Sequence, residues 1–343
     1  MKIHHRSFLA AGRKHVKQWL LALGALLVMD ATPAFSADSS LRLLQTVSLG
    51  GVEGRLDHLS VDVKGERLFV AALGNNTIEV IDLRGGKRIQ TLRGMHKPSG
   101  VLYVPERNRL YVANSEDGSV KVVHGSTFDL IKTVQELDDA DNLRYDSNTK
   151  LVYVGYGKGA LAVIETVHEA RIADLKLKGH PESFQLQAEG KRIFVNVPDA
   201  RQIAIIDRQR REQVAALPMD KYQANFPMAL DEAGHCLFVG CRQPPRLLVF
   251  DSESGQPRSD LAISGDADDL FFDSQRKRIY VSCGEGFINV IEQTSPDKYK
   301  LTEKISTSPG ARTSLFNSEL NRFFLAVPHE GQQNPEVRIY QPR

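Results

Sequence analysis

Acidic, histidine and arginine side chains recur at fixed distances from a motif that the chain repeats seven times. In each copy a short β-prone run ends in a polar residue, usually Asp, and the charged residues stand four, five or seven positions before it. Arg242 and His329 follow later strands of their copies, close to prolines that hold a loop at low entropic cost. The candidate ligand-binding residues are therefore Asp57, His58, Asp141, Asn142, His180, Glu182, Arg242, Asp268, Asp269, Arg312 and His329.

These residue types support three kinds of chemistry. Arg242 and Arg312 could bind a carboxylate or phosphate with paired hydrogen bonds, while the acids and histidines accept hydrogen bonds from donors on the same ligand. The histidines, His96 among them, and the acids are also the N and O ligands that a divalent metal takes, although no HxH or HxxxH spacing is present. Finally, His180 and Glu182 could act as general acid and base, with Arg242 stabilising developing negative charge.

The residue types at these offsets differ from copy to copy, whereas the surrounding motif stays constant. Solvated polar residues that cap turns would also occupy such positions. A purely structural turn, however, would more readily repeat one residue type. The variation therefore favours an asymmetric ligand site, and no Gly-x-Ser-x-Gly elbow is present to indicate a serine nucleophile.

Short strands must position these residues. Each copy places an aromatic residue between apolar neighbours, and these residues are Phe69, Tyr111, Tyr153, Phe194, Phe238, Tyr280 and Phe324. The first run of each copy ends at Asp62, Tyr103, Asp146, Gln187, Asp231, Asp273 and Asn317, at intervals of 41 to 44 residues. Four β-rich segments per copy, separated by Gly- and Asn-containing turns, have the spacing of β-propeller blades.

The two ends of the repeat array complement each other. The last copy supplies segments 313–316, 321–327 and 336–340 and lacks a fourth, while the segment 41–49 resembles the fourth segment of other copies. The N-terminal strand should therefore complete the last blade and leave no bare edge. We predict an all-β fold, a seven-bladed β-propeller with four-stranded blades, as a single domain over residues 37–343.

Residues 1–36 have the layout of a bacterial signal peptide, with a basic start, the apolar run 19–29 and the small-residue site Ala34-Phe35-Ser36. Without them, 44 basic and 42 acidic residues become 39 and 41, so the net charge changes from +2 to −2. This balance argues against binding nucleic acid. We expect a periplasmic or secreted monomer with no membrane span after cleavage.

Three cysteines remain in the mature chain, Cys236, Cys241 and Cys283, and they are too few for a disulfide framework. Cys241 and Cys283 occupy equivalent positions in neighbouring copies, so a bridge between them is conceivable. Equivalent positions in adjacent blades are often farther apart than a disulfide allows. Buried free thiols are the favoured expectation.

The segment Leu110-Tyr111-Val112-Ala113-Asn114 and its counterparts resemble the YVTN-type β-propeller repeat of surface-layer and exported bacterial proteins. The resemblance covers about residues 41–343. It implies a seven-bladed propeller that acts as an exported binding protein, and the related lactonase propellers imply a hydrolase as the alternative. Quinone-dependent propellers usually carry tryptophan-rich repeats, whereas the one tryptophan here, Trp19, lies in the predicted signal peptide.

Together these observations predict an exported, non-enzymatic binding or scaffold protein. Its polar central funnel would hold a small polar ligand, an ion or a peptide. The alternative is a lactonase-like hydrolase or a lyase at the same funnel, using His180, Glu182 and Arg242. No cofactor motif is recognisable, and a divalent metal remains an open expectation.

Overall fold

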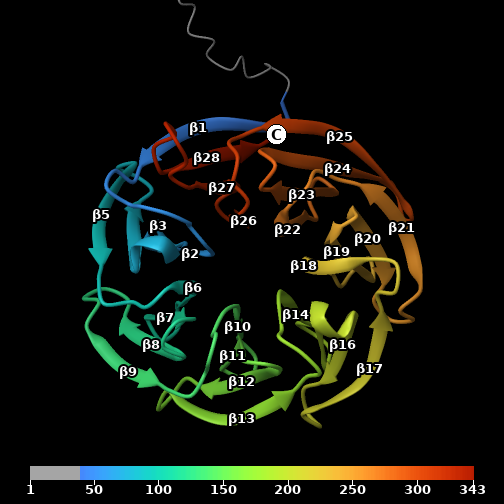
Figure 1. Cartoon of the computed structure of the whole chain (residues 1–343), viewed down its shortest axis with the longest axis horizontal. Helices are drawn as coiled ribbons and strands as arrows, with labels where there is room; N and C mark the ends of the chain where they lie inside the picture. Colours follow the sequence, from blue (N-terminus) through green and yellow to red (C-terminus); the bar gives the residue numbers. More distant parts are fainter. Residues whose placement is uncertain (1–38) are drawn as a thin grey trace, which may run out of the picture. The chain divides into compact units, whose positions relative to one another are not determined.

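The computed structural model describes residues 39–343, and the predicted signal peptide lies outside them. The described residues form 28 strands in seven four-stranded antiparallel sheets, which are arranged as blades around a ring (Figure 1). This confirms the seven-bladed β-propeller. In the first six blades the strands follow chain order from the centre of the ring outwards.

The strand bounds follow the repeat. Blades 1 to 3 are formed by β2 (Leu59–Asp62), β3 (Arg67–Ala72), β4 (Thr77–Asp82), β5 (Lys87–Leu92), β6 (Pro98–Val104), β7 (Arg109–Asn114), β8 (Ser119–His124), β9 (Leu130–Val134), β10 (Leu143–Asp146), β11 (Leu151–Tyr156), β12 (Ala160–Glu165) and β13 (Ala170–Lys176). Blades 4 and 5 are formed by β14 (Phe184–Leu186), β15 (Arg192–Val197), β16 (Gln202–Asp207), β17 (Glu212–Pro218), β18 (Gln223–Asp231), β19 (Cys236–Gln243), β20 (Pro245–Asp251) and β21 (Pro257–Ala262).

Blades 6 and 7 are formed by β22 (Ala267–Asp273), β23 (Arg278–Cys283), β24 (Phe287–Ser295), β25 (Lys298–Ser306), β26 (Ser314–Asn317), β27 (Arg322–Val327), β28 (Glu336–Pro342) and β1 (Leu41–Ser48). Two short 3-10 turns, η1 (Leu73–Asn75) and η2 (Pro198–Ala200), interrupt blades 1 and 4. The first strands end at or within one residue of their predicted ends.

The repeated motif has a direct structural cause. Leu68, Phe69 and Val70 in β3 are all fully buried, because the second strand of a blade is covered by the neighbouring blades on both faces. Asp62, at the end of β2, accepts a hydrogen bond from the backbone N–H of Gly65 and pairs with Arg67 at 2.7 Å. The acid at the strand end therefore caps the turn that leads into the buried strand.

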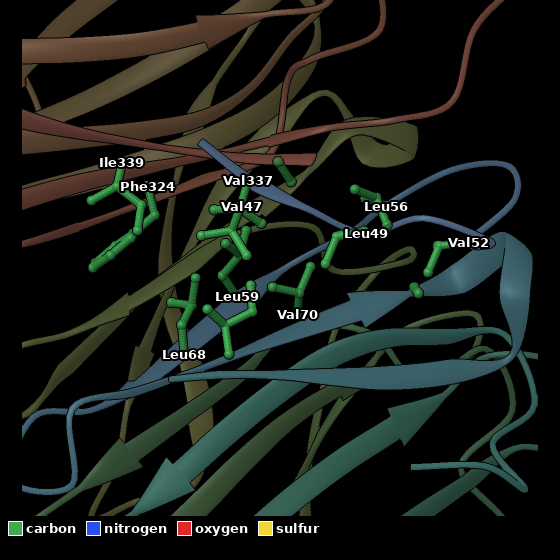
Figure 2. Close-up of a cluster of buried hydrophobic side chains, with 13 residues drawn as sticks. Val47, Leu49, Val52, Leu56, Leu59, Leu68, Val70, Phe324, Val337 and Ile339 are labelled. Carbon is green, nitrogen blue, oxygen red and sulfur yellow. The ribbon is translucent and has the colours of Figure 1, made fainter. Parts of the chain in front are cut away.

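The N-terminal strand closes the ring as predicted. β1 pairs antiparallel with β28, with Leu41 opposite Pro342 and Ser48 opposite Glu336. Val47 and Leu49 then pack with residues of both the first and the last blade, in the core cluster drawn in Figure 2. Closure of the ring by β1 therefore buries apolar side chains and also pairs the free edge of β28.

Cys236, Cys241 and Cys283 are buried and unpaired. Cys241 and Cys283 belong to different hydrophobic clusters, on opposite sides of blade 5, which explains why equivalent positions do not meet. Within residues 39–343, no helix has the length and apolar character needed to cross a membrane.

Candidate functional site

The first strands of the blades lie nearest the centre of the ring (Figure 1), so the residues just before them converge. They surround a cavity of about 270 Å³, which we call the funnel cavity. Eight of the eleven predicted ligand-binding residues line it: Asp57, His58, Asp141, His180, Glu182, Arg242, Asp268 and Arg312. The offset of five residues before the strand end therefore identifies one ring of side chains in space.

The remaining three predicted residues lie elsewhere. Asn142 and Asp269 line a second cavity of about 480 Å³ along the channel, which we call the channel cavity, and His58 lines both. His329 lines neither cavity and instead pairs with Glu53 at 2.8 Å. His329 follows the second strand of blade 7 by two residues, and the loop carries it away from the funnel. It is not part of the funnel cavity.

The arginines of the funnel are already paired with aspartates. Arg312 contacts Asp266 at 2.6 Å and Asp268 at 3.0 Å. Arg242 bonds to Asp268 and lies 3.3 Å from Asp266, with its guanidinium 3.9 Å from the ring centroid of Phe226. The expected anion clamp would have to break these pairs, so the pairing disfavours that interpretation.

His58 lies among three aspartates. Its Nδ1 is 3.7 Å from Asp269, and its Nε2 is 3.9 Å from Asp141 and 4.0 Å from Asp57. Burial opposes protonation, but the charges of Asp269, Asp57 and Asp141 outweigh it and raise the pKa of His58 to about 10. His58 is therefore an imidazolium at neutral pH, and it links the two cavities electrostatically.

Glu182 is the carboxylate of the funnel without a partner. In the described part of the chain, no group forms a hydrogen bond or ion pair with its side chain. Burial raises the pKa of Glu182 to about 8, Asp141 and Asp268 act in the same direction, and Arg242 and His58 oppose them. Burial likewise raises the pKa of Asp57 to about 7. Burial, and secondarily the neighbouring acids, thus favour the neutral forms of Glu182 and Asp57.

Two functional candidates were missed at the sequence level, although the repeat contained the signal for both. Arg55 stands seven residues before Asp62, at the offset that identified His180, and it pairs with Asp57 at 2.9 Å. Arg144 stands two residues before Asp146 and lines the channel cavity. A comparison of every offset across the seven copies would have shown both as charged exceptions.

The two other histidines considered for a metal lie in different surroundings. His180 donates a hydrogen bond from its Nδ1–H to the carbonyl of Gly157 at 2.7 Å. His96 is half exposed and lies 3.7 Å from Asp117, outside the funnel cavity. Among residues 39–343, no group of three or more His, Cys, Asp or Glu side chains is arranged to hold a metal ion.

No family model matches the chain. Two relatives described as "Uncharacterized protein YncE", from Salmonella typhi and Salmonella typhimurium, are 29% and 28% identical to it over 104 residues. The match covers 30% of this chain and 29% of each relative. The solved structure of Kuenenia stuttgartiensis hydrazine synthase matches with a TM-score of 0.72 and 16% identity, over 80% of this chain and 94% of that one. These similarities support a propeller with distant YncE-like relatives, while the YVTN-type assignment stays a prediction.

Proposed function

We propose that the protein is an exported binding protein whose funnel cavity holds a small ligand carrying a protonated amine. The observation that carries the proposal is the Glu182 carboxylate, which faces the cavity without a partner among the described residues. The guanidiniums of Arg242 and Arg312 pair with Asp266 and Asp268, and neither forms an ion pair with Glu182. An ammonium group would favour ionisation of Glu182, give the carboxylate an ion-pair partner and offer three hydrogen-bond donors.

The size of the cavity limits the ligand. A volume of about 270 Å³ is at the small end of ligand sites and favours a molecule of a few non-hydrogen atoms, or the amino end of a peptide. Export to the periplasm or beyond is part of the same proposal, and it is supported by the composition of residues 1–36.

The test compares three four-carbon probes by isothermal titration with the mature chain: 1,4-diaminobutane, 1,4-butanediol and succinate. We expect the diamine to bind and the neutral and anionic probes not to bind. Because Glu182 must lose its proton to pair with the amine, binding at pH 7 should release protons, which buffers of different ionisation enthalpy measure.

Glu182→Gln should weaken diamine binding at least tenfold. Glu212→Gln is the matched control, because Glu212 lies on the outer strand β17 with 60% of its side chain exposed. Binding of succinate in place of the diamine would contradict the proposal and restore the arginine clamp.

The alternative enzyme function has one observation in its favour. A carboxyl group with a pKa near 8 is protonated at neutral pH and can act as a general acid, and Glu182 has this property. Turnover of simple lactones by the mature chain, lost in Glu182→Gln and kept in Glu212→Gln, would favour a hydrolase or lyase over a pure binding protein.

A further inference from the structure

Arg144 lies in the wall of the channel cavity. The residues two positions before each first-strand end form one ring in that wall: Ser60, Val101, Arg144, Gln185, Ala229, Phe271 and Leu315. Arg144 is the charged member of this ring. Its backbone lies three residues after Asp141, and its guanidinium reaches back to Asn142 and Ser183.

Burial lowers the pKa of Arg144, the charges of Asp269 and Asp141 oppose this, and in the described part of the chain no carboxylate lies within ion-pair distance of the guanidinium. Its Nη1 donates to the carbonyl of Leu143 at 2.8 Å and to Oδ1 of Asn142 at 3.4 Å, and its Nη2 donates to Oγ of Ser183 at 3.4 Å. The guanidinium lies 5.5 Å from the ring centroid of Phe184. Within the described residues no carboxylate forms an ion pair with Arg144, and its Nε donates no hydrogen bond.

The other ionisable groups of this cavity are occupied with each other. Of the described residues that line it, only His58, Arg144 and Asp269 are ionisable. Asp269 accepts a hydrogen bond from the backbone N–H of Ser314 at 2.7 Å and faces the imidazolium of His58 at 3.7 Å. Asp269 therefore acts on Arg144 through its charge without forming an ion pair with it.

Structural arginines of this protein look different. Arg67, Arg208 and Arg276 lie at the blade turns with 12–23% of their side chains exposed, and each pairs with the acid at the end of a first strand at 2.7–3.0 Å. Arg144 is also partly buried but has no such acid. Among the described residues, Arg322 likewise lacks an acid and donates only to the carbonyls of Leu320 and Asn321. It lines neither the funnel cavity nor the channel cavity, however, whereas Arg144 lines the channel cavity.

We propose that Arg144 is the centre of a binding subsite for a small oxyanion, a carboxylate or a phosphate, in the central channel. The guanidinium offers a planar set of donors that matches two oxygens of such a group. Ser60, on the same ring, already accepts a hydrogen bond from the backbone N–H of Tyr103 at 2.9 Å, so its hydroxyl hydrogen is free to donate. The subsite does not depend on the amine site of the funnel, from which it differs in cavity and in charge.

The experiment titrates the mature chain with sodium formate and, separately, with inorganic phosphate, against sodium chloride at equal ionic strength. The side-chain Nε–H signal of Arg144 is followed by NMR and assigned through Arg144→Lys, and the melting temperature is measured in parallel. We expect one of the two anions to shift this signal saturably and to raise the melting temperature above its value in chloride. The formate and phosphate arms distinguish a carboxylate from a phosphate ligand.

Three variants complete the test. Arg144→Gln should abolish the anion response, and Arg144→Lys should bind at least tenfold more weakly, because it keeps the charge but loses the planar fork. Arg210→Gln, at an arginine with 69% of its side chain exposed, is the matched control and should respond like the wild type. Glu182→Gln should also keep the response, so that failure of the funnel proposal and failure of this one can be told apart.

Two results would overturn the inference. One is an equal rise of the melting temperature in wild type and Arg144→Gln, which would reflect a general ion effect. The other is the absence of a saturable shift with either anion, together with a lower melting temperature of Arg144→Gln in chloride, which would make Arg144 structural. If Arg144→Gln does not fold, the wild-type NMR titration and Arg144→Lys decide.

Discussion

Replacement of Glu182 by glutamine should stabilise the fold, and the gain should grow with pH. Glutamine has nearly the same shape as a protonated glutamic acid but stays neutral at every pH. The carboxyl of Glu182 has its pKa raised from 4.5 to about 8, so between these values the folded protein holds a proton that the unfolded chain has released. Uptake of that proton on folding costs free energy, and the cost increases as the pH rises.

The magnitude follows from the two pKa values. One pKa unit corresponds to about 1.4 kcal/mol, so the gain of Glu182→Gln should be near zero at pH 4, at most about 2 kcal/mol at pH 6 and at most about 4 kcal/mol at pH 8. Above pH 8 the gain should level off, because folded and unfolded chains are then both ionised. Relaxation of the cavity makes these values upper limits.

Urea denaturation of the mature chain at pH 4.5, 6 and 8 measures the difference. Far-UV circular dichroism is the suitable signal, because the sequence has one tryptophan and it precedes residue 37. Ionic strength is held constant, since salt screens the charges of the funnel. Glu212→Gln serves as the control and should show no comparable rise with pH.

The reasoning would be refuted by a stability difference between wild type and Glu182→Gln that is the same at pH 4.5 and pH 8. That result would mean that Glu182 ionises as it does in solvent, so burial would not disfavour its charged form. A pH-dependent loss of stability in the variant would refute it equally, because it would show that the ionised carboxylate is stabilised by its surroundings.

Three further results are expected. His58→Gln should lower the free energy of unfolding by up to about 5 kcal/mol below pH 6.5, and the loss should shrink as the pH approaches 10, because the aspartates around His58 raise its pKa to about 10; urea titrations at several pH values measure this. Cys236, Cys241 and Cys283 are buried and should react with a thiol reagent only after denaturation; prompt labelling of the native chain would contradict the packing. Leu49→Ala should cost about 2–5 kcal/mol, because it opens the core between the first and last blades; a thermal melt equal to that of the wild type would refute this role in ring closure.

The fold could be predicted from sequence because its repeat is periodic. Seven apolar triplets centred on Phe69 and its counterparts specify the buried second strands, and the acids at positions such as Asp62 specify the turns before them. The position of β1 in the last blade followed from counting strands. Each of these signals is local, and the ring repeats it seven times.

The sequence allowed us to predict which residues line the candidate site. It did not allow us to predict which of them form ion pairs with each other. The offset of five residues identified Asp57, Asp141 and Glu182 as neighbours across the ring, since equivalent positions of a propeller meet at the same height. His329 was predicted instead from its proline-containing loop, and the loop after β27 carries it away from the funnel. Loop direction depends on contacts that the repeat does not encode.

The sequence by itself determined that the residues before the seven first strands converge at the centre of the ring. It also determined which residue types meet there. Only the tertiary structure decided which charges neutralise each other: Arg242 and Arg312 are held by aspartates, whereas Glu182 and Arg144 face their cavities without an ion pair among the described residues. The physical reason is that ion pairing depends on distances of a few ångströms between side chains of different blades. The position of a residue within its repeat determines how far along the central channel its side chain lies. The packing of neighbouring blades determines the distances between side chains of different blades.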